Sequence, residues 1–346
     1  MTENRQPRLR VTVANTERGL AHAVQSTMVD SGLLDRVSTE TRVALKPNLT
    51  YPFHRPGVTT SPAVIREVVR VLREHTSHIA VVETDGGYGA WQATEAFKAH
   101  GIYELQDQYG IDVVNLNDES RELIRFRSGR LTCQLPLPTR LTQDTDLFIT
   151  MPVPKVHAMT GLTLAYKNQW GCIPDAMRLR RHYVFEDAIV AINRVLKPAV
   201  VADGTFFLDR NGPLEGDPVA MDLVISATDA GSFDCYTSEL MRFPWSSVRH
   251  LRCAVRLGDM PCSVEQIECN LPPSDVSQRS FRLERSLRNY LALCGFRSKF
   301  ATWLGYESWF GRVVLHGILY ALVGRPVRPK SPEDQDGPVP VLGEKG

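Results

Sequence analysis

Short apolar runs alternate with segments of helical periodicity through most of the chain. Residues 43–45, 79–82, 147–150 and 199–202 are apolar enough to predict buried strands. Residues 19–34, 61–72 and 183–196 instead carry apolar residues every three or four positions, and Ser61-Pro62 is a strong helix start. A predicted hairpin of residues 123–126 and 131–137 adds antiparallel pairing. The pattern predicts an α/β fold with a mainly parallel, mixed sheet flanked by helices.

The pattern changes near residue 276 and divides the chain into four parts. We expect a disordered tail at 1–8, an α/β domain at 9–275, a helical C-terminal segment at 276–324 and a disordered, Pro-rich tail at 325–346. Residues 309–324, WFGRVVLHGILYALVG, are mostly apolar but too few to span a bilayer. A helix packed on the core, a homo-oligomer interface and a helix on a membrane surface all remain open for this run.

Composition excludes several classes of protein. The 346 residues are 43% hydrophobic and 23% charged, with a net charge of +1, so bulk charge predicts no nucleic-acid partner. The N-terminal residues lack the apolar region of a secretory signal, and no run predicts a transmembrane segment, so we expect a cytoplasmic protein. The seven cysteines form no CxxC pair, which predicts reduced thiols and no iron–sulfur cluster in this chain.

Polar residues and glycines follow one predicted strand after another. Ligands bind beyond the carboxyl ends of the strands in open α/β sheets, so we expect these residues to gather along one edge. Residues 205–218, rich in Gly and Pro, predict a functional loop after the fourth of these strands. The strand-end residues are Lys46 and Asn48; Asp85, Gly86 and Gly87; Lys155 and His157; Asp203 and Gly204; and Thr228 and Asp229.

The densest group of candidate residues follows the predicted strand at 147–150. Lys155, His157, Lys167 and Asn168 lie within fourteen residues, and His182 follows in a basic run. Histidine exchanges protons near neutral pH, and lysine clamps an anion or becomes a base when burial and positive neighbours lower its pKa. So many cations predict an anionic ligand, either a carboxylate or a phosphate.

Two further features extend this predicted site. Thr59 and Thr60 precede a helix N-terminus, where hydroxyls and free N–H groups suit an anion. Asp203 with Asp85 or Asp229 offers oxygen ligands to a divalent metal, and the sequence leaves any cofactor unknown. The chain lacks GxSxG, P-loop and HExxH motifs, and the glycines at 86–89 lack dinucleotide-binding spacing.

An ordered series of motifs covers roughly residues 40 to 270. The pieces are ALKPN (44–48), GVTTSP (57–62), ETDGG (83–87), PVPKVHAMTGLTLAYKNQWG (152–171), RLRRH (178–182), VADG (201–204), NGPLEG (211–216) and TDAGSFD (228–234). In these pieces the chain resembles the domain of unknown function 362 (DUF362) family. The resemblance implies an α/β fold and a site built from the motifs, but no particular reaction. Some relatives look as if they carry a ferredoxin-type module, whose cysteines are missing here.

The leading functional hypothesis is a cytosolic enzyme that acts on a small anionic metabolite by acid–base chemistry. An isomerase, lyase or cyclase fits this best, with Lys155, His157, Lys167 and His182 as catalytic candidates. The substrate-binding candidates are Lys46, Asn48, Thr59, Thr60, Asp85, Gly86, Gly87, Asn168 and Asp203. One alternative is a non-catalytic protein that binds or senses an anionic ligand. Another is a redox-associated protein that depends on a partner's iron–sulfur cluster.

Overall fold

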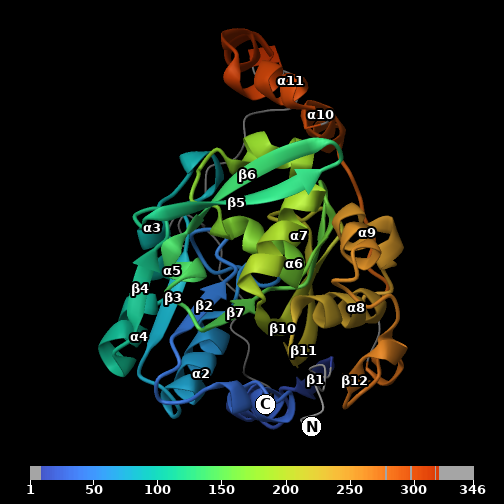
Figure 1. The fold of residues 1–346 in the computed structure, drawn as a ribbon. Coiled ribbons are helices and arrows are strands. Elements are labelled where there is room, and N and C mark those ends of the chain that lie inside the picture. Colours follow the sequence, from blue (N-terminus) through green and yellow to red (C-terminus); the bar gives the residue numbers. More distant parts are fainter. Residues whose placement is uncertain (1–8, 277–278, 297, 316, 319–346) are drawn as a thin grey trace, which may run out of the picture.

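The computed structural model of the protein describes residues 9–276, 279–296, 298–315 and 317–318. The predicted tails at 1–8 and 325–346, and residues 319–324 of the apolar run, lie outside these ranges. The described chain forms a large mixed sheet with helices on both faces and a helical C-terminal segment (Figure 1). The predicted fold class is therefore confirmed.

Five neighbouring strands of the main sheet are parallel and place their carboxyl ends at one edge. The path is β12-β1-β11-β10-β7-β2-β3-β4, in which β10, β7, β2, β3 and β4 run parallel, while β11 is antiparallel to both β10 and β1. The short strands β8 and β9 extend the sheet beside β10. The bounds are β1 (Arg10–Asn15), β2 (Val43–Pro47), β3 (Ile79–Glu83), β4 (Asp112–Asn115), β7 (Leu147–Met151), β8 (Lys155–His157), β9 (Gly161–Thr163), β10 (Ala199–Asp209), β11 (Asp217–Ala227) and β12 (Glu268–Cys269).

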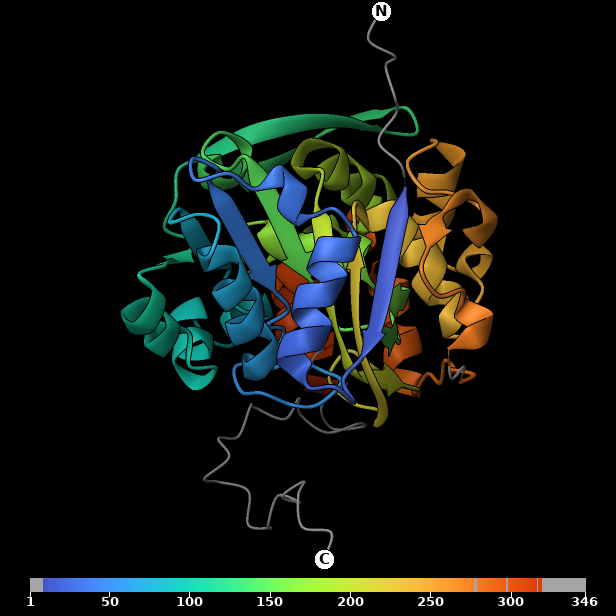
Figure 2. The same cartoon turned by 90° about the horizontal axis from the view of Figure 1, so that it is seen from below.

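Alternate residues of the central strands supply two separate cores. Val43 and Leu45 of β2 pack with the first group of helices, whereas Ala44 packs with the second group on the opposite face, as the two-residue period of a strand requires. Figure 2 shows α1 and α2 over the first face. The first group is α1 (Leu20–Asp30), α2 (Pro62–Arg73), α3 (Ala93–Ala99) and α4 (Ile102–Tyr109), and the second is α6 (Ala165–Asn168), α7 (Phe185–Leu196), α8 (Ala230–Leu240) and α9 (Arg249–Arg256).

The remaining elements lie outside the main sheet. The predicted hairpin is β5 (Arg121–Ser128) with β6 (Leu131–Pro138); it forms a sheet of its own and leads into the single turn α5 (Thr139–Thr142). The C-terminal segment contains α10 (Leu287–Gly295), α11 (Lys299–Thr302) and two π-helical turns at Trp303–Glu307 and Gly311–Leu315 (Figure 1). None of the helices described is both long and apolar enough to cross a membrane.

Two expectations about local structure were wrong. The loop predicted after Asp203 is mostly strand, because β10 continues to Asp209 and pairs with β11 from Asp217 onward. Since β11 runs antiparallel, its end places Thr228 and Asp229 at the opposite edge of the sheet, where Asp229 caps α8 by accepting a hydrogen bond from the Ser232 N–H at 2.8 Å. The helix predicted at 183–196 is confirmed as α7, which begins two residues later and follows a 3₁₀ helix at Arg178–Val184.

Candidate functional site

A buried ion pair joins the carboxyl ends of β2 and β3. The Lys46 Nζ donates to Glu83 Oε2 at 2.8 Å, and the two side chains are only 2% and 7% exposed. Glu83 also accepts hydrogen bonds from the backbone N–H groups of Leu49 at 3.3 Å and Thr84 at 2.9 Å. Gly171 packs directly against this ion pair, because a Cβ there would lie 2.9 Å from the Lys46 Nζ. Lys46 is thus fixed by its carboxylate partner.

Lys155 and His157 follow on β8, and both are buried in positive surroundings. The Lys155 Nζ donates to the carbonyl oxygen of Val58. Burial, followed by the charge of Lys167, holds the pKa of Lys155 well below its ordinary value, and Asp203 opposes this effect. The pKa of His157 is held well below its ordinary value by burial and then by Lys167 and Lys155.

Backbone hydrogen bonds fix the form of the His157 ring. Its Nδ1 accepts the N–H of Met159 at 3.0 Å and that of Thr160 at 3.4 Å. A ring nitrogen that accepts a hydrogen bond carries no hydrogen, so the neutral imidazole bears its hydrogen on Nε2. His157 is therefore set up as a neutral group that donates through Nε2.

Lys167 is the least constrained cation of the group. It lies on α6, is half-buried, and has no hydrogen-bond or ion-pair partner among the described residues. Burial, followed by the charges of Arg178 and Lys46, lowers its pKa to about 7. Because its own charge lowers the pKa of Lys155 and His157, these side chains act on one another as one group. We call Lys46, Lys155, His157, Lys167 and Arg178 the cationic cluster, in which His157 is itself neutral.

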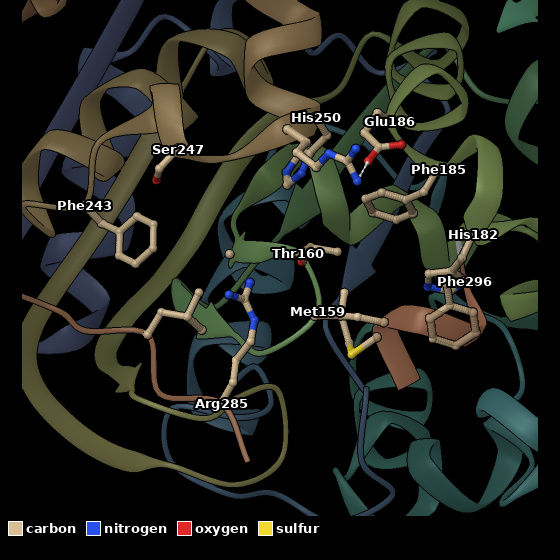
Figure 3. A pocket seen from close by; sticks show the side chains of 14 residues that line it. Met159, Thr160, His182, Phe185, Glu186, Phe243, Ser247, His250, Arg285 and Phe296 are labelled. Carbon is tan, nitrogen blue, oxygen red and sulfur yellow. Dashed lines mark ion pairs between the residues drawn. The ribbon is translucent and has the colours of Figure 1, made fainter. Parts of the chain in front are cut away.

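A cavity of about 480 Å³, whose lining side chains are drawn in Figure 3, is linked electrostatically to the cationic cluster through two histidines, although none of the five residues of the cluster lines it. Two histidines in its wall, His182 and His250, both lower the pKa of His157, and Thr160 belongs to the wall as well. The wall also includes residues of the C-terminal segment, because Leu293 and Phe296 lie in it. The full lining is Met159, Thr160, Gly161, His182, Phe185, Glu186, Phe243, Ser247, Arg249, His250, Leu283, Arg285, Leu293 and Phe296.

Aromatic rings hold His182 in place. It is stacked on Phe185 and Phe296, with ring centroids 5.4 Å and 4.6 Å away, and its Nδ1 is 2.8 Å from the carbonyl oxygen of Leu179. Burial is the main reason that its pKa falls to about 4, with further lowering by Lys167. His182 is therefore neutral at physiological pH.

His250 brings an unpaired polar atom to the cavity wall. Its side chain is buried, and its Nε2 has no hydrogen-bond partner within the described part of the chain. Burial and then Lys167 lower its pKa to about 3, so the ring is neutral. Buried polar atoms are normally hydrogen-bonded, but this nitrogen has almost no accessible surface, so a ligand in the cavity does not contact it in this arrangement. Arg285 adds a cation to the same wall and donates from its Nε to the Ala158 carbonyl at 2.6 Å.

Asp203, Thr59 and Thr60 make bonds that fix the loop before α2. Asp203 accepts hydrogen bonds from the Ser61 N–H at 2.7 Å and the Thr205 hydroxyl at 2.6 Å. Thr60 accepts the Asn48 N–H at 2.8 Å and donates to the Met151 carbonyl at 2.7 Å, while Thr59 accepts the Arg55 N–H at 3.0 Å. These contacts give the loop a defined path beside the cationic cluster.

Asp85 also makes structural contacts. Its Oδ1 accepts the Ala93 N–H at 2.9 Å and the Asn115 amide at 3.1 Å, and its carbonyl accepts both terminal nitrogens of Arg178 at 3.1 Å. Gly86 lies against the indole of Trp91, which a Cβ would approach to 2.4 Å, whereas Gly87 faces open space. Among the residues described, no group of three or more His, Cys, Asp and Glu side chains is placed to hold a metal ion.

Asn168 belongs to a buried network that sequence reasoning missed. Its Nδ2 donates to the Thr150 hydroxyl at 2.8 Å and to the Lys46 carbonyl at 3.3 Å. Thr150 in turn donates to Gln169 at 2.9 Å, and Gln169 donates to Asn193 at 2.8 Å. The network ties α6 to the ends of β7 and β2, and so fixes the helix that carries Lys167.

Sequence reasoning also missed Glu83, His250 and Arg285. Glu83 had a usable signal, since it ends the apolar strand IAVVE, where an unpaired charge would be costly. No sequence pattern marks His250 or Arg285 as a site residue. His250 is a single histidine on α9, Arg285 follows His157 by 128 residues, and only the fold brings both to the wall of one cavity.

Two known proteins and one family model are similar to this chain. The chain is 26% identical over 250 residues to a thylakoid-associated protein from Synechocystis sp.. The aligned region covers 68% of this chain and 73% of that protein. A solved structure of a protein from Thermotoga maritima aligns with 13% identity and a TM-score of 0.37, covering 62% of this chain and 56% of the other. The family model described as "Domain of unknown function (DUF362)" matches residues 43–239. Since this match takes in more than half of the chain, the protein belongs to the DUF362 family.

Proposed function

We propose that this protein is a cytoplasmic enzyme that moves a proton on a small anionic metabolite, in an isomerase, lyase or cyclase reaction. The observation that carries the proposal is Lys167, a half-buried lysine without a carboxylate partner among the described residues, whose pKa falls to about 7. A base works best when its pKa lies near the working pH, and lysines reach this range through burial and positive neighbours. A fold gains no stability from such a lysine.

In this proposal the cationic cluster transfers the proton, and the cavity wall binds the substrate. Lys167 takes the proton from the carbon next to the substrate's carboxylate or phosphate-bearing group. His157, neutral and with its hydrogen on Nε2, donates a hydrogen bond to the negative charge that develops. Arg285 binds the anionic group in the cavity. Lys46 and Lys155 are too buried to reach a ligand, so they act through their effect on the pKa of Lys167 and His157.

The cavity wall also restricts the substrate. Phe185, Phe243, Leu283 and Leu293 make one part apolar, while arginine and histidine make the other polar. A small metabolite with an apolar portion and one anionic end matches both parts. A volume of about 480 Å³ is within the range that holds a small metabolite.

Proton exchange offers a test that needs no knowledge of the substrate. The purified protein is incubated in D₂O with a panel of carboxylate and phosphate metabolites, and mass spectrometry follows both new products and deuterium on carbon. We expect label or product from the wild type and a loss of about 100-fold or more in Lys167→Met, the usual range for removing a general base. Lys98→Met, an exposed lysine on α3, is the matched control and should retain full rate.

The outcomes separate the hypotheses. If Lys167→Met labels its substrate as fast as the wild type, Lys167 is not the base and the assignment fails. A metabolite that co-purifies and exchanges on the protein without deuterium uptake or conversion would instead favour the non-catalytic binding protein. In that case Arg285→Gln should lower the affinity for the metabolite. Lys167→Met should change only how that affinity varies with pH.

A further inference from the structure

The C-terminal segment exposes apolar side chains to an unusual degree. Of the sixteen large hydrophobic side chains exposed in the described parts of the chain, ten lie between residues 287 and 318. Phe300 and Trp309 are each 68% exposed, and Trp303 is 48% exposed. We call these ten side chains the C-terminal apolar surface. Soluble proteins rarely expose so many together unless the surface binds something.

Residue types on this surface favour a lipid interface. Trp and Tyr prefer the boundary between lipid and water, because each combines an apolar ring with a polar group. Tyr290, Trp303 and Trp309 are such residues, and α10 and α11 project from the end of the molecule, away from the main sheet (Figure 1).

Charge points to the same partner. By sequence, residues 287–318 contain four basic residues, at 288, 297, 299 and 312, and one acidic residue, Glu307. Glu307 is already paired with Arg180 at 3.5 Å, and Lys299 is exposed. Basic and aromatic residues mixed in one segment are typical of helices that lie on anionic membranes.

A second copy of the chain fits less well. A two-fold interface would bring the same basic segment from both subunits together, so like charges would face one another. The helices are also short, with nine residues in α10 and four in α11, which gives no continuous stripe for pairing helices.

We infer that the C-terminal apolar surface docks on the anionic phospholipid face of a bilayer, with its aromatic side chains in the interfacial layer. The segment lies on the membrane and does not cross it. Leu293 and Phe296 of the same segment line the cavity, so docking brings one wall of the cavity next to the lipid interface. The inference rests on the surface alone and holds whatever reaction the cavity supports.

Vesicle sedimentation with the full chain tests the inference. The vesicles are phosphatidylcholine alone, or an equimolar mixture of phosphatidylcholine and phosphatidylglycerol. The test variant combines Phe300→Ser, Trp303→Ser and Trp309→Ser. The control combines Leu123→Ser and Leu131→Ser on the β5–β6 hairpin, whose side chains are comparably exposed, at 61% and 58%. Circular dichroism checks that both variants keep the fold.

We expect the wild type and the control to sediment with the anionic vesicles, less well with phosphatidylcholine alone, and less well at high salt. The triple variant should bind at least tenfold more weakly. Equal binding of the triple variant and the wild type would overturn the inference, as would a wild type that binds neither vesicle. A stable dimer in ultracentrifugation that the triple variant abolishes would assign the surface to a second copy instead.

Discussion

Removing the Lys46 amine tests how the strand-end ion pair contributes to stability. Lys46→Met keeps the length of the side chain but leaves the Glu83 carboxylate buried without its cation. Breaking one half of a buried pair typically costs about 3–5 kcal/mol, mainly because a charge is left unpaired. Glu83 retains backbone N–H donors at 2.9 and 3.3 Å, so we expect a loss near the lower end, about 3 kcal/mol.

A double-mutant cycle separates the pair from its surroundings. In Lys46→Met/Glu83→Gln neither charge remains, so the combined loss should fall short of the sum of the single losses by about 2 kcal/mol. Urea unfolding followed by circular dichroism measures all four proteins. Arg42→Met is the control, because Arg42 pairs with Asp146 at 2.9 Å but both side chains are nearly half exposed. If Lys46→Met lowers the free energy of unfolding no more than Arg42→Met does, the buried ion pair contributes no more to stability than an exposed one. An additive cycle would likewise show that Lys46 and Glu83 do not stabilise one another.

Three further predictions concern other residues of the candidate site. The pKa of Lys167 falls from 10.5 to about 7, so the unfolded chain binds more protons than the folded chain between these values. Lys167 therefore lowers stability most below about pH 7, and the stabilising effect of Lys167→Met should shrink as urea unfolding is repeated at rising pH up to about 10. Gly171→Ala places a Cβ 2.9 Å from the fixed Lys46 Nζ and should lower the free energy of unfolding by about 1–3 kcal/mol; wild-type stability would show that the amine moves aside. Asp203→Ala removes the acceptor of the Ser61 N–H and should cost about 1–2 kcal/mol, with faster hydrogen exchange at the start of α2.

Part of the candidate site followed from residue types at strand ends. Lys46 could be placed from sequence because it directly follows a buried strand, and parallel neighbours bring such ends together. The same reasoning misplaced Asp229, because nothing in residues 217–227 reveals that this strand runs antiparallel. Strand direction depends on which neighbour the strand pairs with, and that is decided by packing across the whole sheet.

The sequence by itself determined the alternation of strands and helices, the mixed α/β class, and the crowd of cations between Lys155 and Lys167. These follow from local periodicity and residue type, which a linear reading contains. Only the tertiary structure decided which cations are neutralised and which remain free. Lys46 meets Glu83 37 residues later, whereas the charges that lower the pKa of Lys167 in the described part of the chain are the positive charges of Arg178 and Lys46. Pairing, burial and pKa depend on distances between distant segments, so the chemistry of each lysine is set by the fold.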